Sequence, residues 1–499
     1  MRITNKMMTN NMMSNINKNK LGMNSLEEQY SSGKKIQRPS DDPIVTVRAL
    51  KLRTNLSELS QYYEKNIPDA KSWMDVTESA LTTVNDILKQ VNTYCVQGSS
   101  DTLTASDRSS IVSNLDQLKQ QIYQEGNTNY AGRYVFTGYK TDSSLMFTED
   151  QKNLTYQITE NKTGDSIQVV KKISGGYDLS DFDNNPLENF SVAPQTNETY
   201  RIQLSYDQLN STPPVNNIQI FQKNSSGVMV EQTPFTNIAT VSATAADAYL
   251  PTTNEAHYIP ETGEIILGSA AYQELRTADN MKITYSKTGF ESGSLKPEHY
   301  FDCVMTDSDK PEQGQITYTK ADQQIQYEVN YNQKLTINTQ GSDAISHEIG
   351  RKIDDIKNTV NDVVKVEDKI KEVEKRLADT SLTQTVIDRY NKLKDQLDTE
   401  LQLKKDAMQE AFEKGITASN SEQDRVNIAV ADLGSRSVRL ELTENRLSTQ
   451  KVDFEDLLSQ NEDADMADTL IKYNSAETIY NASLSAAGKI VQKSLLDFL

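Results

Sequence analysis

Residues 45–94 carry apolar side chains at alternating steps of four and three residues. A 3.5-residue period held over this length is typical of a long helix packed along other helices, because a lone surface helix rarely keeps that register. Pro68 predicts a kink or short break, since proline removes a helical hydrogen bond. An ordinary helical bundle core would show the same pattern, so the seam alone does not indicate assembly. The rod-domain seam consists of Leu52, Leu56, Leu59, Tyr63, Trp73, Val84 and Ile87.

A hinge precedes this helix. Gly33 suits the position just after a first helix, and Pro39 prevents that helix from continuing. Asp42 has the side chain of an N-cap, and Pro43 fits the first helical position, where its missing N–H costs nothing. We expect residues 38–43 to connect two helices.

The C-terminal end is also helical. Two charged helices are expected within residues 343–415, and the C-terminal part of the rod then has apolar residues at intervals of seven: Leu433, Leu440, Leu447 and Phe454. The final helix repeats the seam pattern. We predict that its assembly seam contains Met466, Leu470, Tyr473, Tyr480, Leu484, Ala487, Val491 and Phe498.

The middle of the chain changes period. Segments such as 200–206 and 281–285 alternate apolar and polar residues as half-buried strands do. We therefore expect an elongated α+β multidomain protein, with long terminal helices in a coiled-coil-like bundle and a β-rich middle. Its expected parts are an inner assembly helix (1–40), the N-terminal part of a helical rod domain (41–140), the β-rich middle (141–342), a helical insertion (343–415), the C-terminal part of the rod (416–460) and a second inner assembly helix (461–499).

Composition excludes several classes of protein. The formal net charge is −19, from 52 basic and 71 acidic residues, so a nucleic-acid binder is not expected. No apolar run is long enough to insert into a membrane. Residues 1–20 lack the apolar core of a cleavable signal peptide. Cys95 and Cys303 are far apart in sequence and are expected to be isolated thiols.

No catalytic or metal-binding pattern is present. His347-Glu348 would begin an H-E-x-x-H zinc motif, but Arg351 occupies the position of the second histidine. His299 precedes Cys303 by four residues without a second pair of ligands. We expect solvated or loop histidines, no cofactor, no metal and no enzyme activity.

Four segments resemble the bacterial flagellins: Met1–Thr4, Ser32–Pro43 and Gly132–Gly138 match their N-terminal region, and Leu458–Ala467 with the following helix matches their C-terminal region. Within that family, the hinge Arg38–Pro43 is similar to the branch that joins hook to filament. Filament flagellins typically carry alanine and glycine after the paired aspartates.

The resemblance implies a structural subunit of the flagellum, exported through the flagellar type III pathway without a cleaved signal peptide and located outside the cell at the hook–filament junction. It implies self-assembly into a ring of about eleven subunits. The other implied partners are a neighbouring hook-associated protein, flagellin and an export chaperone. Two alternatives are a filament flagellin and, from another class, a surface adhesin or secreted binding protein on a coiled-coil stalk.

The narrow terminal seams suggest how such assembly would work. An isolated helix of this kind buries too little apolar area to offset the ordering entropy of its backbone, about 1–2 kcal/mol per residue. We therefore expect residues 1–40 and 462–499 to be largely disordered or loosely helical in the free monomer, and to become ordered on assembly.

Overall fold

The computed structural model describes residues 5–100, 103–174, 179, 193–245, 247–379 and 381–496. The chain divides into two compact units. The first unit combines Met1–Asp69, Tyr327–Leu335 and Val438–Leu499, and the second combines Ala70–Gln326 and Thr336–Ser437. Segments from both ends of the sequence thus build the first unit.

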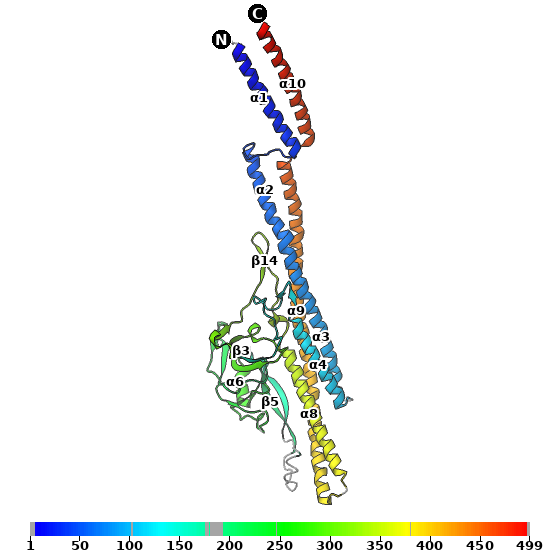
Figure 1. The fold of residues 1–499 in the computed structure, drawn as a ribbon. Coiled ribbons are helices and arrows are strands. Elements are labelled where there is room, and N and C mark those ends of the chain that lie inside the picture. The colour runs from blue at the N-terminus through cyan, green and yellow to red at the C-terminus, as the bar shows by residue number, and fades with distance from the viewer. Residues whose placement is uncertain are drawn as a thin grey trace. The chain divides into compact units, whose positions relative to one another are not determined.

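The first unit is mainly helical. It contains α1 (Asn5–Ser32), α2 (Pro43–Gln61), the last part of α9 (Gln384–Glu462) and α10 (Met466–Leu496). The terminal helices α1 and α10 lie side by side, blue and red in Figure 1. A hairpin of β14 (Gln326–Asn330) and β15 (Gln333–Thr336) contributes Tyr327–Leu335 to this unit.

The helix around Pro68 changes its geometry. A π-helical turn, η1 (Tyr62–Asn66), separates α2 from α3 (Ile67–Gly98). Proline cannot donate to the carbonyl four residues earlier and its ring needs extra room there, which a widened π turn supplies. The hairpin covers this point, since the side-chain amide of Asn66 donates to the Glu328 carbonyl over 2.8 Å. The structure therefore keeps the helix through Pro68 with one irregular turn.

Long helices also run through the second unit. It contains most of α3, α4 (Ala105–Glu125), α8 (Glu348–Leu377) and most of α9, with Thr104 and Asp107 forming a capping box at the start of α4. Helix α8 and the first part of α9 share an apolar cluster built from Val366, Ile370, Val373, Tyr390, Leu393 and Leu397. Helix α9 is continuous across residue 415, the expected boundary between the helical insertion and the C-terminal part of the rod. Apolar residues are buried on both sides of this point, among them Phe412 and Val426.

Two sheets form the β-rich part of the second unit. One has the strand order β4-β5-β10-β9-β8, and the other β13-β12-β3-β11-β6-β7. Neighbouring strands pair antiparallel except β8 with β9. The strands are β3 (Gln151–Lys162), β4 (Gln168–Ser174), β5 (Gln195–Gln203), β6 (Ile218–Lys223), β7 (Met229–Glu231), β8 (Ile238–Thr240), β9 (Ala256–Ile259), β10 (Glu264–Leu267), β11 (Asn280–Phe290), β12 (Asp302–Asp307) and β13 (Gln315–Tyr318).

Short elements complete this unit. They are β1 (Asn129–Tyr130), β2 (Arg133–Tyr134), α6 (Ser269–Leu275), α7 (Gly341–Ala344), η2 (Gly164–Ser166), η3 (Pro297–His299) and η4 (Pro311–Gln313).

The core of the β-rich part draws on both sheets. Ile158, Ile202, Ile265 and Ile283 come from β3, β5, β10 and β11 and belong to one buried cluster. Since side chains alternate along a strand, the neighbours of Ile202 and Ile265 point to the other face of the five-stranded sheet. That face carries the polar residues discussed below.

The expectation of solvated histidines is wrong for His257 and His347, which are buried. His257 Nδ1 lies 3.0 Å from the Ala248 carbonyl oxygen, and His347 packs among three aromatic rings. Cys95 and Cys303 are both free and buried. Among the described residues, no helix combines the length and apolar character needed to cross a membrane.

Candidate assembly interface

The N-terminal hinge is built as a helix end followed by a helix start. Gly33 has a φ of +71°, the left-handed conformation that glycine adopts without strain, and its N–H donates to the Gln29 carbonyl. The Asp42 carboxylate then accepts hydrogen bonds from the N–H groups of Ile44 and Val45 over 3.0 and 3.1 Å, which caps α2. Pro43 is the first residue of α2, and Pro39 lies in the turn before it. All four predicted hinge residues thus lie at helix ends or in the connecting turn.

Asp41 also stabilises this turn. Its carboxylate accepts from the N–H groups of Arg38 and Gln37 over 2.8 and 3.1 Å. These two backbone hydrogen bonds lower the pKa of Asp41. The paired aspartates therefore fix the backbone on both sides of the hinge.

A second hinge separates α9 from α10. The Asp465 carboxylate accepts from the N–H groups of Ala467 and Asp468 over 3.0 and 3.1 Å, as an N-cap does. Acidic side chains at the start of the last helix are expected here, because their negative charge interacts favourably with the positive end of the helix dipole.

The two hinges are bonded to each other. The Lys35 N–H donates to the Glu462 carbonyl over 2.7 Å, and the Ala464 N–H donates to the Gly33 carbonyl over 2.8 Å. Lys34 and Asp463 form an ion pair between these two hydrogen bonds. The hydrogen bond with Lys34 lowers the pKa of Asp463 and raises that of Lys34. Sequence reasoning missed this pairing, although opposite charges at the two hinges were a visible signal.

One face of α10 packs toward α1. Tyr473, Tyr480 and Ala487 are half-buried. On the same side, the Ser483 hydroxyl accepts a hydrogen bond from the Asn19 amide over 3.1 Å. The α1 positions that are buried or half-buried recur at helical spacing: Met12, Ile16, Asn19, Met23, Leu26 and Gln29.

A second row on α10 is open. Met466, Leu470 and Leu484 are 43, 41 and 44% exposed. Their spacings of four and fourteen residues place them along one flank of the helix. Val491 lies within α10, but its side chain and the whole of Phe498 are outside the part of the chain that the structure describes.

The predicted rod-domain seam lies inside the helical packing. Leu52, Leu56, Tyr63 and Phe454 are half-buried. The remaining predicted positions are buried: Leu59, Trp73, Val84, Ile87, Leu433, Leu440 and Leu447.

Two seam-flanking asparagines on α3 bind α9. The Asn85 amide donates to the Asn427 amide oxygen over 2.9 Å, and the Asn92 amide donates to Asn420 over 2.9 Å. Asn92 lies seven residues after Asn85 on α3, and its partner Asn420 lies seven residues before Asn427 on α9. This pattern is expected of two antiparallel helices packed in heptad register.

Trp73 contacts the chain that follows α4, at the start of the flagellin-like segment Gly132–Gly138. The Arg133 guanidinium lies 4.9 Å from the centre of the indole ring, and the Tyr130 ring meets it edge-on at 6.1 Å. Cation–π and edge-to-face contacts of this kind fix the direction in which the chain leaves α4.

Comparison with known proteins agrees with this arrangement of the ends. Residues 3–141 match the model of the bacterial flagellin N-terminal helical region, and residues 416–499 match that of the C-terminal helical region. Flagellar hook-associated protein 3 of Salmonella typhimurium is 31% identical over 170 residues, covering 33% of this chain and 53% of the relative. A flagellin of Clostridium tyrobutyricum is 34% identical over 126 residues, covering 25% of this chain and 33% of the relative.

The similarity to solved structures is more distant. A putative flagellar hook-associated protein from Vibrio parahaemolyticus is 12% identical with a TM-score of 0.37, covering 85% of this chain and 100% of that one. The chain spans about half the length of the curated hook-associated relatives it matches. The resemblance noted in the sequence is confirmed at both ends: the chain carries the N- and C-terminal helical regions of the bacterial flagellin family.

Proposed function

We propose that this protein is a structural subunit of the bacterial flagellum that joins hook to filament by self-assembly of its terminal helices. The observation that carries the proposal is the open apolar row on α10, Met466, Leu470 and Leu484, beside a face already engaged with α1. Apolar rows of this kind are stabilised when another helix packs against them. In this proposal, that helix belongs to another copy of the same chain.

The similarity to hook-associated protein 3 supports the junction over the filament. Under this proposal, the subunits form a closed ring of about eleven copies. A neighbouring hook-associated protein and flagellin bind on its two sides, an export chaperone holds the chain before secretion, and no enzyme activity or cofactor is involved. The protein would lie outside the cell, having been exported without a cleaved signal peptide.

Immunogold electron microscopy on isolated flagella tests the position. A band at the hook end supports the junction role, whereas label along the whole filament supports filament flagellin. The copy number per flagellum gives an independent measure, because a ring needs few copies and a filament needs many.

Removing residues 148–320 separates the structural role from that of an adhesin. This deletion takes out β3 to β13 and leaves the β14–β15 hairpin of the first unit in place. A junction subunit should still reach the hook and allow filaments to grow. An adhesin would lose its binding function while its helices remained.

A further inference from the structure

The five-stranded sheet has a polar face covered by helix. Arg201 and Gln203 of β5 flank the core residue Ile202, and Glu264 of β10 precedes the core residue Ile265. Strand alternation turns these polar side chains away from the core. Gln203 and Asp355 of α8 are hydrogen-bonded at 3.2 Å, so α8 lies over this face.

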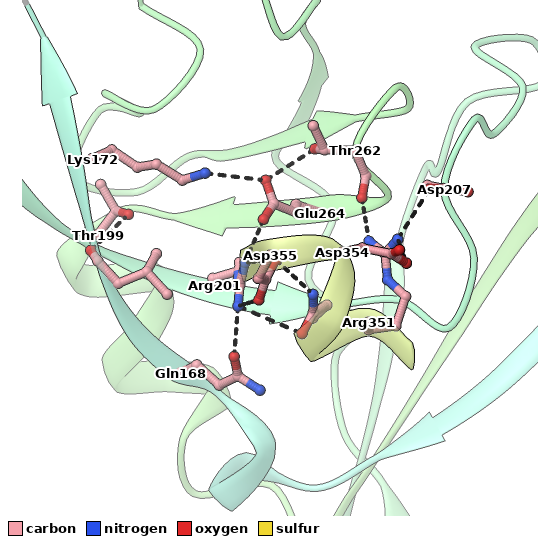
Figure 2. Close-up of polar contacts among 12 residues, drawn as sticks. Gln168, Lys172, Thr199, Arg201, Asp207, Thr262, Glu264, Arg351, Asp354 and Asp355 are labelled. Carbon is pink, nitrogen blue, oxygen red and sulfur yellow. Dashed lines mark hydrogen bonds and ion pairs between the residues drawn. The ribbon is translucent and has the colours of Figure 1, made fainter. Parts of the chain in front are cut away.

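Arg201 is the centre of a buried ionic network (Figure 2). Its guanidinium donates to Glu264 over 2.6 Å and to both carboxylate oxygens of Asp355 over 2.7 and 3.1 Å. Only 3% of Arg201 is exposed. Burial alone would raise the pKa of Asp355, but the adjacent Arg201 outweighs it and holds that pKa below its ordinary range. A buried charge is stable only when it is paired in this way.

A cavity of about 300 Å³ lies beside this network, between the polar face of the sheet and the helices α8 and α9. That volume is at the lower end of the range for small-molecule sites. The lining contains seven basic residues, Lys171, Lys172, Arg201, Arg351, Lys352, Lys404 and Lys414. It contains five acidic residues, Glu264, Asp354, Asp355, Asp362 and Glu410.

The cavity wall is less acidic than the protein as a whole. Asp207 and Glu400 lie just outside the lining and pair with Arg351 and Lys404, so the basic and acidic side chains at the cavity balance, in a chain whose net charge is −19. A neutral wall repels an anion less than the acidic surface elsewhere does.

Some donors in the wall lack a protein acceptor. Among the residues that the structure describes, neither Arg201 Nε nor Arg351 Nε has a hydrogen-bond partner, and both are buried. The Lys172 side chain is 32% exposed, and its ammonium is ion-paired with Glu264 at 3.9 Å and lies 4.3 Å from the centre of the Tyr249 ring. Buried donors without acceptors cost free energy unless a ligand satisfies them.

We propose that this cavity is a binding site for a small organic oxyanion, a carboxylate- or phosphate-bearing molecule held by Lys172, Arg201 and Arg351. The carboxylates already paired with Arg201 orient the guanidinium, and the remaining N–H groups supply the contacts with the ligand. The site is built from residues of the second unit, whereas the hinges and the α10 row belong to the first, so the inference does not rest on the proposed assembly function.

Isothermal titration of the full-length protein with citrate and, separately, with glycerol 3-phosphate tests the proposal. At low ionic strength at least one of them should bind saturably, at one site per chain. The two titrations distinguish a carboxylate from a phosphate ester. Sodium chloride at matched ionic strength should give no saturable signal.

Asn358→Asp is the discriminating variant. Asn358 lines the cavity from the exposed side of α8, so the added charge should repel the ligand without disturbing the core. We expect binding to weaken by about tenfold. Asn391→Asp is the matched control: it makes the same change on an exposed part of α9, thirteen residues before Lys404 and so about 20 Å along the helix.

Lys172→Gln provides a second variant, which removes one donor and leaves the Arg201 pairs intact. Weaker binding in both cavity variants, with unchanged affinity in Asn391→Asp, supports the site. The absence of saturable binding by either anion overturns it. Equal losses in Asn358→Asp and Asn391→Asp also overturn it, because they would show a general charge effect.

Discussion

Arg53 of α2 and Glu462, the last residue of α9, form an ion pair with 2.6 Å between Nη2 and Oε2. The Glu462 side chain is 5% exposed, and its backbone carbonyl accepts from Lys35 of the opposite hinge. One residue thus holds the start of the N-terminal rod and the two hinges together. Because both hinges depend on Glu462, a substitution that weakens one hinge should also loosen the other.

Glu462→Ala should loosen both hinges. It leaves the Arg53 and Lys34 side chains without this acceptor, at a cost of about 1 kcal/mol for a hydrogen bond between charged groups that is partly exposed. In the assembled protein, hydrogen exchange should become faster at residues 33–42 and 459–468 together. Asp456→Ala, an exposed change on the same helix, should leave both segments unchanged. Faster exchange in the C-terminal segment alone would contradict a shared connection.

The rod seam can be tested with two leucines on one helix. Leu440 is 1% exposed and Leu442 is 67% exposed, although they are two residues apart in α9. Leu440→Ala should lower the free energy of unfolding by about 2–5 kcal/mol, since it leaves a cavity. Leu442→Ala should change it by less than about 0.5 kcal/mol. Urea denaturation followed by circular dichroism measures the free energy of unfolding of both variants. Similar losses in the two would refute the prediction that the seam residue Leu440 packs inside the rod.

Two glycines near the N-terminus should respond in opposite directions to alanine. A Cβ at Gly22 or Gly33 would meet no atom within 4 Å, so only backbone conformation differs. Gly22 lies inside α1, where alanine should stabilise the helix by about 0.5–1 kcal/mol. Gly33 has a φ of +71°, where alanine should cost about 1 kcal/mol. Hydrogen exchange of residues 5–32 in the assembled protein should slow for Gly22→Ala and quicken for Gly33→Ala. The same direction of change in both would contradict this account of the hinge.

The sequence was most informative where structure is local. Gly33, Asp42 and Pro43 predicted the helix ends through their own backbone preferences, and the heptad spacing predicted buried residues such as Trp73. The π turn was not predicted in detail, because the pattern showed where Pro68 interrupts the helix but not how the backbone adjusts.

The polar cavity could not have been found in this way. Arg201, Glu264 and Asp355 lie on two strands and a helix that are far apart in sequence, and only the pairing of β5 with β10 and the packing of α8 on that sheet bring them together. The burial of His347 depends on the same long-range packing, since Tyr206 and Tyr300 enclose it from other segments.

The free energy of unfolding should fall as the pH is lowered below about 6.5, before the carboxylates become protonated. Burial lowers the pKa of His347 to about 3 from an ordinary value of 6.5, and it lowers the pKa of His299 to about 3 as well. The unfolded chain takes up these protons below about pH 6.5, while the folded chain does not. The contribution of the two neutral, buried histidines to the free energy of unfolding is therefore complete above pH 6.5. It is lost as the pH falls toward 3, by about 1.4 kcal/mol per pH unit for each histidine.

His347→Phe isolates this effect, because phenylalanine suits the surrounding aromatic rings. Between pH 7.5 and pH 5.5, the hydrogen-exchange protection factors in β3 and β11, which correct for the pH dependence of intrinsic exchange, should fall less in this variant than in the unaltered protein. An equal change in both proteins would rule out His347 as a source of the acid sensitivity.

Incorporation of a Leu484→Asp variant into flagella tests the central claim most directly. Leu484 belongs to the open α10 row, so the charge should block contact between subunits while the rest of the chain stays folded. Ser475→Asp adds the same charge on the opposite side of α10, nine residues earlier, and should be tolerated. In a strain that lacks the native protein, we predict immunogold-labelled hook ends and filaments with Ser475→Asp, and neither with Leu484→Asp. Normal labelled junctions carrying Leu484→Asp would contradict the account.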